Sequence, residues 1–313
     1  MVWSTLAEQV TIFTTVFLGI FMEAVPFLLL GSVASGLVEV FVSKEDLMRL
    51  MPRNAALATL TGAALGLAFP VCECGVVPLT RRLFRKGLPV SSGIAFLLAA
   101  PIINPVVIAS TFAAYGLSRI FVMRFVLGLV VATVVGLVFT LNSRPIDMIR
   151  LSSMAPVSGG AGEASPVPRT GLRNLSLSEK LKQAMRIGAD DFFEMGLYLV
   201  IGSVLASLMQ TVIPQNVMLS IGSGSLISVL VMQALAYVLS ICSTVDAFVS
   251  LAFAKTFTTG SVLAFLVFGP MVDIKSTLMF LGVFKRKYVF YLVMLPFLVV
   301  TLISTFINLN VAW

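Results

Sequence analysis

The sequence contains few charged residues. Only 11% of its 313 residues are charged, whereas about 25% are charged in a typical soluble domain. Hydrophobic residues account for 58% of the chain, and its mean hydropathy is +1.05. This composition excludes a water-soluble globule and predicts an integral membrane protein.

Histidine is absent, and there are only three cysteines. Without histidine, the chain cannot carry the HExxH zinc-protease motif or a histidine acid–base catalyst. Three cysteines do not suggest a disulfide framework, and the sequence has no GxxxxGKS or GxxxxGKT motif for ATP binding. We therefore predict no catalytic residues, no enzyme activity and no cofactor.

The net charge of +7 comes from basic residues that lie between apolar segments, not in a stripe with interleaved aromatic residues. This distribution follows the positive-inside tendency and argues against a nucleic-acid partner. The expected partners are the lipid bilayer and a small substrate, with a homo-oligomer as a further option.

Long uncharged runs separate the charged residues. A helix needs about 20 apolar residues to cross the hydrocarbon core. The runs are continuous and do not alternate with polar residues, which excludes the strands of a membrane barrel. The N-terminal segment lacks a basic region and a cleavage pattern, so we expect it to be retained as a span. The chain is predicted to be all-α and polytopic; examples of such runs are 54–72, 87–118, 217–245 and 288–313.

The first and second parts of the sequence resemble each other. The sequence FMEAVPFLLLGSV around residue 21 matches FFEMGLYLVIGSV around residue 192, which aligns Glu23 with Glu194. Further matches follow in the same order, although with small shifts in spacing. An ordered series of this kind indicates a duplication and is typical of secondary transporters, whose substrate site lies between the repeats.

The duplication divides the chain into three parts. Residues 1–142 form the first transmembrane repeat, and residues 189–313 form the second. Residues 143–188 are rich in Ser, Gly, Pro and Arg, which predicts a polar cytoplasmic linker. Near its end, residues 174–191 fit either a short amphipathic helix at the membrane surface or a solvated connector.

Each repeat has four apolar segments, so we predict about eight transmembrane helices. The third segment of each repeat is interrupted, by Pro101-Ile102-Ile103-Asn104-Pro105 in the first and by Gly269-Pro270-Met271-Val272-Asp273 in the second. Proline breaks a helix because it removes a backbone donor. Each segment is either a kinked span or a re-entrant hairpin. Eight full spans would give parallel repeats, and hairpins would give inverted ones.

All three cysteines lie at equivalent breaks after the second segment of each repeat. Cys72 and Cys74 flank Glu73, with Pro70 and Gly75 outside them, and Cys242 lies in the matching stretch. Unwound backbone at membrane depth is tolerated only where protein or a water-filled cavity covers it. Thiolates select soft ions, and trivalent arsenic binds up to three sulfurs. We predict a thiol site for a metal or metalloid at Cys72, Cys74 and Cys242.

Charged and polar residues at the breaks are the other candidates, because charge inside a membrane is costly unless it has a function. A carboxylate near the thiols could accept their protons when they bind an ion. The predicted substrate-binding residues are Cys72, Glu73, Cys74, Asn104, Cys242, Asp246 and Asp273, and the proton-coupling candidates are Glu23, Glu194 and Lys275.

Other interpretations of these residues remain open. A lone cysteine such as Cys242 often serves as a small apolar filler. Glu23 and Glu194 could instead pair with arginines near the membrane surface. Gly31 and Gly202, each followed by serine, fit close packing between helices. The basic run from Arg81 to Lys86 fits an exposed loop that sets topology.

The stretch FPVCECGVVPLTRRLFRKGLP, followed by AFLLAAPIINPVV, resembles the bacterial and archaeal predicted-permease family that includes the organoarsenical efflux permease (ArsP-like). The similarity covers nearly the whole chain. It implies a multi-pass permease of the inner (plasma) membrane, and some members export trivalent organoarsenicals or arsenite. Carried over, it places Cys72 and Cys74 at the thiol site and Asn104 on the proline-rich break.

Three functions follow from these observations. The first is a secondary transporter that exports a thiophilic metalloid or metal. The second is a membrane thiol oxidoreductase that uses Cys72 and Cys74 as a redox pair, although it leaves the duplication unexplained. The third is a transporter of an anionic sulfur compound.

Overall fold

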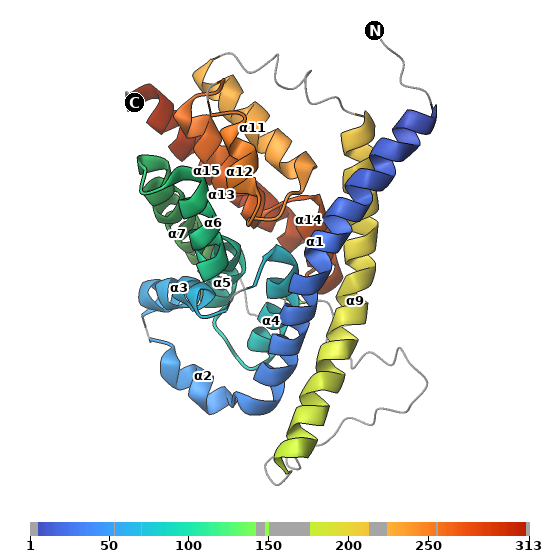
Figure 1. The fold of residues 1–313 in the computed structure, drawn as a ribbon. Helices are drawn as coiled ribbons and strands as arrows, with labels where there is room; N and C mark the ends of the chain where they lie inside the picture. Colours follow the sequence, from blue (N-terminus) through green and yellow to red (C-terminus); the bar gives the residue numbers. More distant parts are fainter. Residues whose placement is uncertain are drawn as a thin grey trace.

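The computed structural model describes residues 6–52, 54–69, 71–141, 148–149, 176–212, 224–254 and 256–310. These residues are helical apart from short connections, and they contain no strand, only an isolated bridge between Ile149 and Phe284. The predicted all-α class is therefore confirmed for the described chain (Figure 1). Most of the predicted linker, and Pro70 beside the cysteine motif, fall outside the described residues.

The helices of the first part of the chain are α1 (Leu6–Phe41), α2 (Lys44–Leu50), α3 (Ala55–Ala64), η1 (Leu65–Leu67), α4 (Glu73–Arg85), α5 (Val90–Ile103), α6 (Pro105–Tyr115) and α7 (Arg119–Thr140). Those of the second part are α9 (Leu177–Val212), α11 (Ser225–Leu239), α12 (Asp246–Leu251), α13 (Thr259–Met271), α14 (Ile274–Val283) and α15 (Arg286–Asn310).

Five helical stretches are long and apolar enough to cross a membrane. They are α1, α7, α9, α15 and the α13–α14 stretch from Thr259 to Val283, and the bent pair α5–α6 makes a sixth if it counts as one span. The structure does not confirm the expected eight. The predicted second segments are short: α3 has 10 residues and α11 has 15, whereas about 20 are needed to cross the hydrocarbon core.

The two longest helices, α1 and α9, lie side by side and run in opposite directions (Figure 1). Each has 36 residues and is about 54 Å long, well beyond the roughly 30 Å of the hydrocarbon core. Residues 177–188, placed by sequence in the linker, form the start of α9. They are neither a separate surface helix nor a connector.

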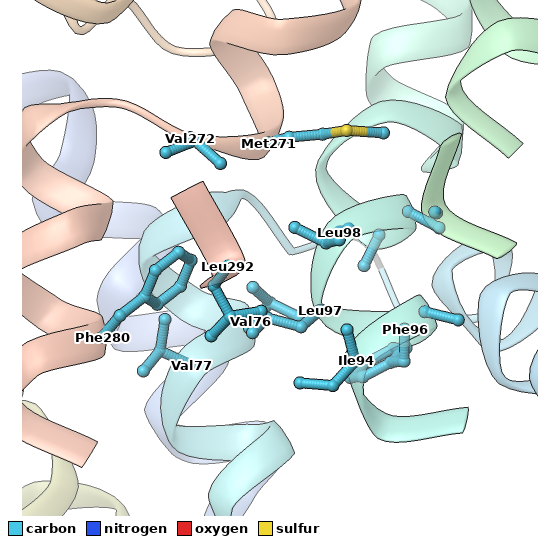
Figure 2. Packing of buried hydrophobic residues seen from close by; sticks show 14 of the residues in the cluster. Val76, Val77, Ile94, Phe96, Leu97, Leu98, Met271, Val272, Phe280 and Leu292 are labelled. Atoms are coloured by element: carbon cyan, nitrogen blue, oxygen red, sulfur yellow. The ribbon is translucent and has the colours of Figure 1, made fainter. Parts of the chain in front are cut away.

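Six of the other helices form two groups of three around a buried centre. α3, α5 and α7 pack on one another, as do α11, α13 and α15, and α5 contacts α13 between the groups. α5 and α13 are apolar on all sides, which is typical of a helix enclosed by protein. Figure 2 shows side chains of this centre in one packed cluster, which includes Val76, Val77, Ile94, Leu97, Leu98, Met271 and Phe280.

Both predicted proline breaks are present, and each starts a new helix. The axes of α5 and α6 differ by 40° at Asn104. The Asn104 side chain caps α6 by accepting the Val107 N–H at 2.9 Å. Asp273 caps α14 in the same way, through the Ser276 N–H at 2.6 Å, and the Ser276 side chain completes a capping box. Such caps satisfy amide donors that the broken helix leaves free.

Candidate functional site

The three cysteines meet where the start of α4 approaches the segment before α12. Cys72 is the N-cap of α4, and Cys242 lies three residues before Val245, the N-cap of α12. All three thiols are free and buried. The Sγ atoms of Cys72 and Cys242 and a carboxylate oxygen of Glu73 all lie within 4.8 Å of one another. The Cys74 thiol lies next to that of Cys72.

This geometry suits a soft ion. Two sulfurs and one carboxylate oxygen could each provide a ligand atom, and Cys74 places a third sulfur beside them. Thiolates prefer soft or borderline ions over Mg²⁺ or Ca²⁺. The cysteines are the only three in the chain, so the structure brings every available thiol to one place.

A buried cation lies beside the thiols. Lys275 Nζ is 3.6 Å from Glu73 Oε1 and 3.5 Å from Asp273 Oδ2, and all three side chains are at most 3% exposed. Neither carboxylate oxygen of Glu73 accepts a hydrogen bond from the described residues. Buried charges are tolerated when they are paired, and this cluster has two carboxylates for one ammonium group.

Two glycine contacts fix the position of this cluster relative to the long helices. A Cβ on Gly31 of α1 would lie 2.3 Å from Gly75 Cα, directly after the cysteine motif. A Cβ on Gly202 of α9 would lie 2.9 Å from Lys275 Cα. Only a residue without a side chain permits such an approach between helices. The predicted close packing at both glycines is present.

Asp246 lies in a second buried ion pair. Its Oδ2 is 2.7 Å from Nη2 of Arg124, which is fully buried on α7. The same nitrogen donates to the Ser243 carbonyl at 3.3 Å, and Nη1 donates to Thr111 Oγ1 at 3.0 Å. Sequence reasoning missed Arg124. The available signal was an arginine inside an otherwise uncharged apolar run.

Asn104 supports the backbone of the cysteine motif. Its Nδ2 group donates to the Val71 and Ala100 carbonyls, each at 3.3 Å, while its Oδ1 caps α6. Val71 directly precedes Cys72. The amide therefore links the proline-rich break to the start of the thiol site.

The two matched glutamates lie in different surroundings. Glu23 is half-buried on α1 and lies near Thr244, Cys242 and Lys275. Glu194 on α9 is 2.7 Å from Arg81 Nη1, which corresponds to the alternative of pairing with an arginine. The structure thus brings Glu23 to the thiol site and places Glu194 elsewhere.

The basic run from Arg81 to Lys86 does not form an exposed loop, so that interpretation is wrong. Most of it belongs to α4, and Arg81 is 2% exposed. Asp191 of α9 lies 2.6 Å from Arg81 and 2.8 Å from Arg82. It also accepts a hydrogen bond from the Ser35 hydroxyl at 2.6 Å. This network attaches α4 to both long helices.

A family described as "Predicted permease" matches residues 9–309 of the chain. The chain belongs to this predicted permease family. It is 42% identical over 281 residues to "UPF0718 protein YcgR" of Bacillus subtilis (strain 168), which covers 89% of this chain and 91% of that protein. Family membership agrees with the resemblance seen in the sequence.

A second relative in the predicted permease family comes from Streptococcus mutans serotype c (strain ATCC 700610 / UA159). It is named "Putative two-component membrane permease complex subunit" and is 36% identical over 277 residues, or 88% of this chain and 87% of the relative. No solved structure matches the chain. The permease is thus an integral membrane protein whose apolar helices contact lipid.

Proposed function

We propose that this permease is a secondary transporter that exports a thiophilic metalloid or metal, such as a trivalent arsenic species, across the inner (plasma) membrane. The meeting of Cys72, Cys74 and Cys242 beside Glu73 is the observation that carries the proposal. These thiols come from two stretches far apart in the chain, so a substrate bound by all of them would link both halves.

The charged groups around the thiols could accept the protons that the thiols lose when they bind an ion. A buried thiol must lose a proton to bind a metal cation, and the Glu73 carboxylate, which accepts no hydrogen bond from the described residues, is close enough to accept that proton. Lys275 and Asp273 adjoin this carboxylate, and Glu23 extends the polar path to a half-buried position on α1. We propose these residues as the proton-coupling route; Glu194, which is paired with Arg81, is a weaker candidate.

The packing supports two repeats that are inverted relative to each other, with boundaries near 1–142 and 189–313. α1 and α9 run in opposite directions, and α3, α5 and α7 pack together as α11, α13 and α15 do. α4 packs on α14 of the other half, and α12 packs on α6. Inverted repeats place the substrate site at their interface, where the thiols lie.

Transport by purified protein in vesicles tests the proposal. Wild-type vesicles are expected to move arsenite, an organoarsenical or a soft metal, and Cys72→Ser and Cys74→Ser should abolish this movement. Met22→Leu is the matched control, because it removes a sulfur from a side chain that is 69% exposed. Unchanged transport in the Cys72→Ser/Cys74→Ser double variant would refute the thiol site.

The same vesicles separate the other functions. Movement of thiosulfate without arsenite would support the anionic sulfur compound, because no thiol-bound ion is then required. A reversible Cys72–Cys74 disulfide that is needed for activity would support the oxidoreductase. Sizing of the purified protein in detergent would show whether the permease forms a homo-oligomer.

A further inference from the structure

The segment that carries Cys242 has an unusual backbone. Ser240, which ends α11, has φ 48 and ψ 41 and is the only non-glycine residue with positive φ in the described chain. Left-handed backbone is disfavoured for residues other than glycine. Such a conformation persists only where the surroundings hold it, and it is common at functional sites.

The surroundings hold this segment from two sides. On one side, Ser240 Oγ accepts the backbone N–H of Ile274 at 3.3 Å, which links the segment to the start of α14. On the other side, Arg124 binds the Ser243 carbonyl at 3.3 Å and Asp246 Oδ2 at 2.7 Å. Cys242 lies between these two attachments.

Arg124 is well suited to this role. It is fully buried, and its second terminal nitrogen is anchored to Thr111 on α6. A planar guanidinium group has donors in a fixed fork, so its partners are held in a defined geometry. α6 and α7 belong to the first half of the chain, whereas the segment belongs to the second. Arg124 therefore links α6 and α7 of the first half to the Cys242 segment of the second half.

We propose that Arg124 is a positioning residue that holds the Cys242 thiol against the Cys72 thiol and so determines whether a bound metalloid has three sulfur ligands or two. The inference rests on the proposed function. Cys72 and Cys74 are neighbours on one element and would remain together without Arg124. The position of the Cys242 thiol relative to the other two, in contrast, depends on contacts between the two halves of the chain.

The chemistry of trivalent arsenic separates the two cases. In each exchange an S–H bond and an As–O bond break, an S–As bond forms, and the thiol proton leaves with the hydroxide as water. Arsenic stays trivalent, so no oxidant is needed. Arsenite can exchange three hydroxides in this way, whereas the hydrated form of phenylarsine oxide has only two to exchange.

The experiment uses the full-length permease in detergent, with arsenite and phenylarsine oxide as probes. X-ray absorption at the arsenic edge counts the sulfur neighbours of bound arsenic, and equilibrium binding gives the affinities. Wild type is expected to show three sulfurs around arsenite and two around phenylarsine oxide. In Arg124→Gln, arsenite should retain two sulfurs and bind about 10–100-fold more weakly, while phenylarsine oxide binding should not change.

Two further variants keep the test decisive. Arg124→Gln/Asp246→Asn leaves no unpaired buried charge and should show the same loss of the third sulfur. Arg119→Gln changes an exposed arginine on the same helix and should behave as wild type. Three sulfurs and wild-type arsenite affinity in the double variant would overturn the inference, and equal loss of both probes would too. If wild type binds neither probe through sulfur, the proposed function itself fails.

Discussion

The Glu73 carboxylate faces the Lys275 ammonium group across 3.6 Å in the centre of the permease, and the two residues come from opposite halves of the chain. Asp273 lies 3.5 Å from the same ammonium group. With all three groups ionised, one negative charge is left beside the thiols. In the proposed function, the thiols would bind the soft ion and these charged groups would move the proton.

Removal of Lys275 should destabilise the protein strongly. Lys275→Met would leave two buried carboxylates without their cation, and breaking a buried pair in this way costs about 3–5 kcal/mol. Thermal unfolding in detergent measures the loss. Lys182→Met, at an exposed position of α9, is the control.

A second substitution in the same cluster should recover part of that stability. Lys275→Met/Asp273→Asn removes one unpaired charge, and asparagine still caps a helix well. We expect the double variant to unfold at a higher temperature than Lys275→Met alone. A double variant no more stable than the single one would contradict the assigned charge pairing.

The helix contacts at Gly31 and Gly202 predict a steric effect that depends on position. Gly31→Ala would press a methyl group into the Gly75 backbone, and overpacking of this kind typically costs about 1–3 kcal/mol or more. Gly19→Ala, on the same helix with nothing within 4 Å, should be neutral or stabilising by up to about 1 kcal/mol.

The same comparison applies to α9. Gly202→Ala should lower the unfolding temperature, because its methyl group would meet Lys275 beside the site, whereas Gly196→Ala has open space. Equal unfolding temperatures for all four alanine variants would show that the helices are not packed as described.

Mild oxidation should join the two halves covalently. The Cys72 and Cys242 sulfurs lie within 4.8 Å, so a modest movement brings them to bonding distance. We expect mass spectrometry of digested, oxidised protein to find a Cys72–Cys242 disulfide, which Cys242→Ser abolishes. Prior saturation with arsenite should prevent it. A Cys72–Cys74 bridge as the sole product would count against the proximity of Cys242.

Removal of Arg81, which lies in a second ion-pair network, should destabilise the protein without changing the thiol site. Arg81→Met would leave Glu194 unpaired and remove one of the two arginines that face Asp191, with an expected cost of about 3–5 kcal/mol for a buried pair. Unfolding in detergent measures this loss. Arg186→Met, at an exposed position of α9, should change it little.

Arsenite binding tests whether the Arg81 network is independent of the thiol site. In Arg81→Met protein that remains folded, arsenite affinity should stay near the wild-type value, because Arg81 does not touch the thiols. An affinity loss as large as that of Cys72→Ser would mean that the Arg81 network belongs to the binding site.

Several features could be predicted from the sequence because they depend on local chemistry. Uninterrupted apolar runs require helices in a bilayer, and the proline-containing stretches 101–105 and 269–273 indicated the breaks that follow α5 and α13. Glycines followed by serine at 31 and 202 signalled close helix contacts. The grouping of three scarce cysteines at equivalent breaks pointed to a common location, and their sulfurs do lie together.

Other features depended on contacts between distant segments. The basic run on α4 has the composition of a loop, but its helix lies against Asp191 and Glu194, which give those charges partners inside the protein. No local pattern distinguishes a charge that faces water from one that faces an acid a hundred residues away. For the same reason, Arg124 gave little sign of its part in holding the Cys242 segment.

The sequence by itself determined that this is a helical membrane protein with its thiols at breaks in the helices, because hydropathy, proline and residue scarcity act along the chain. Only the tertiary structure decided which charges pair. It places Glu23, but not Glu194, near the thiols, and it places the buried Lys275 between the carboxylates of Glu73 and Asp273. Pairing of buried charges depends on distances across packed helices, and those distances are set by how the segments fold against one another.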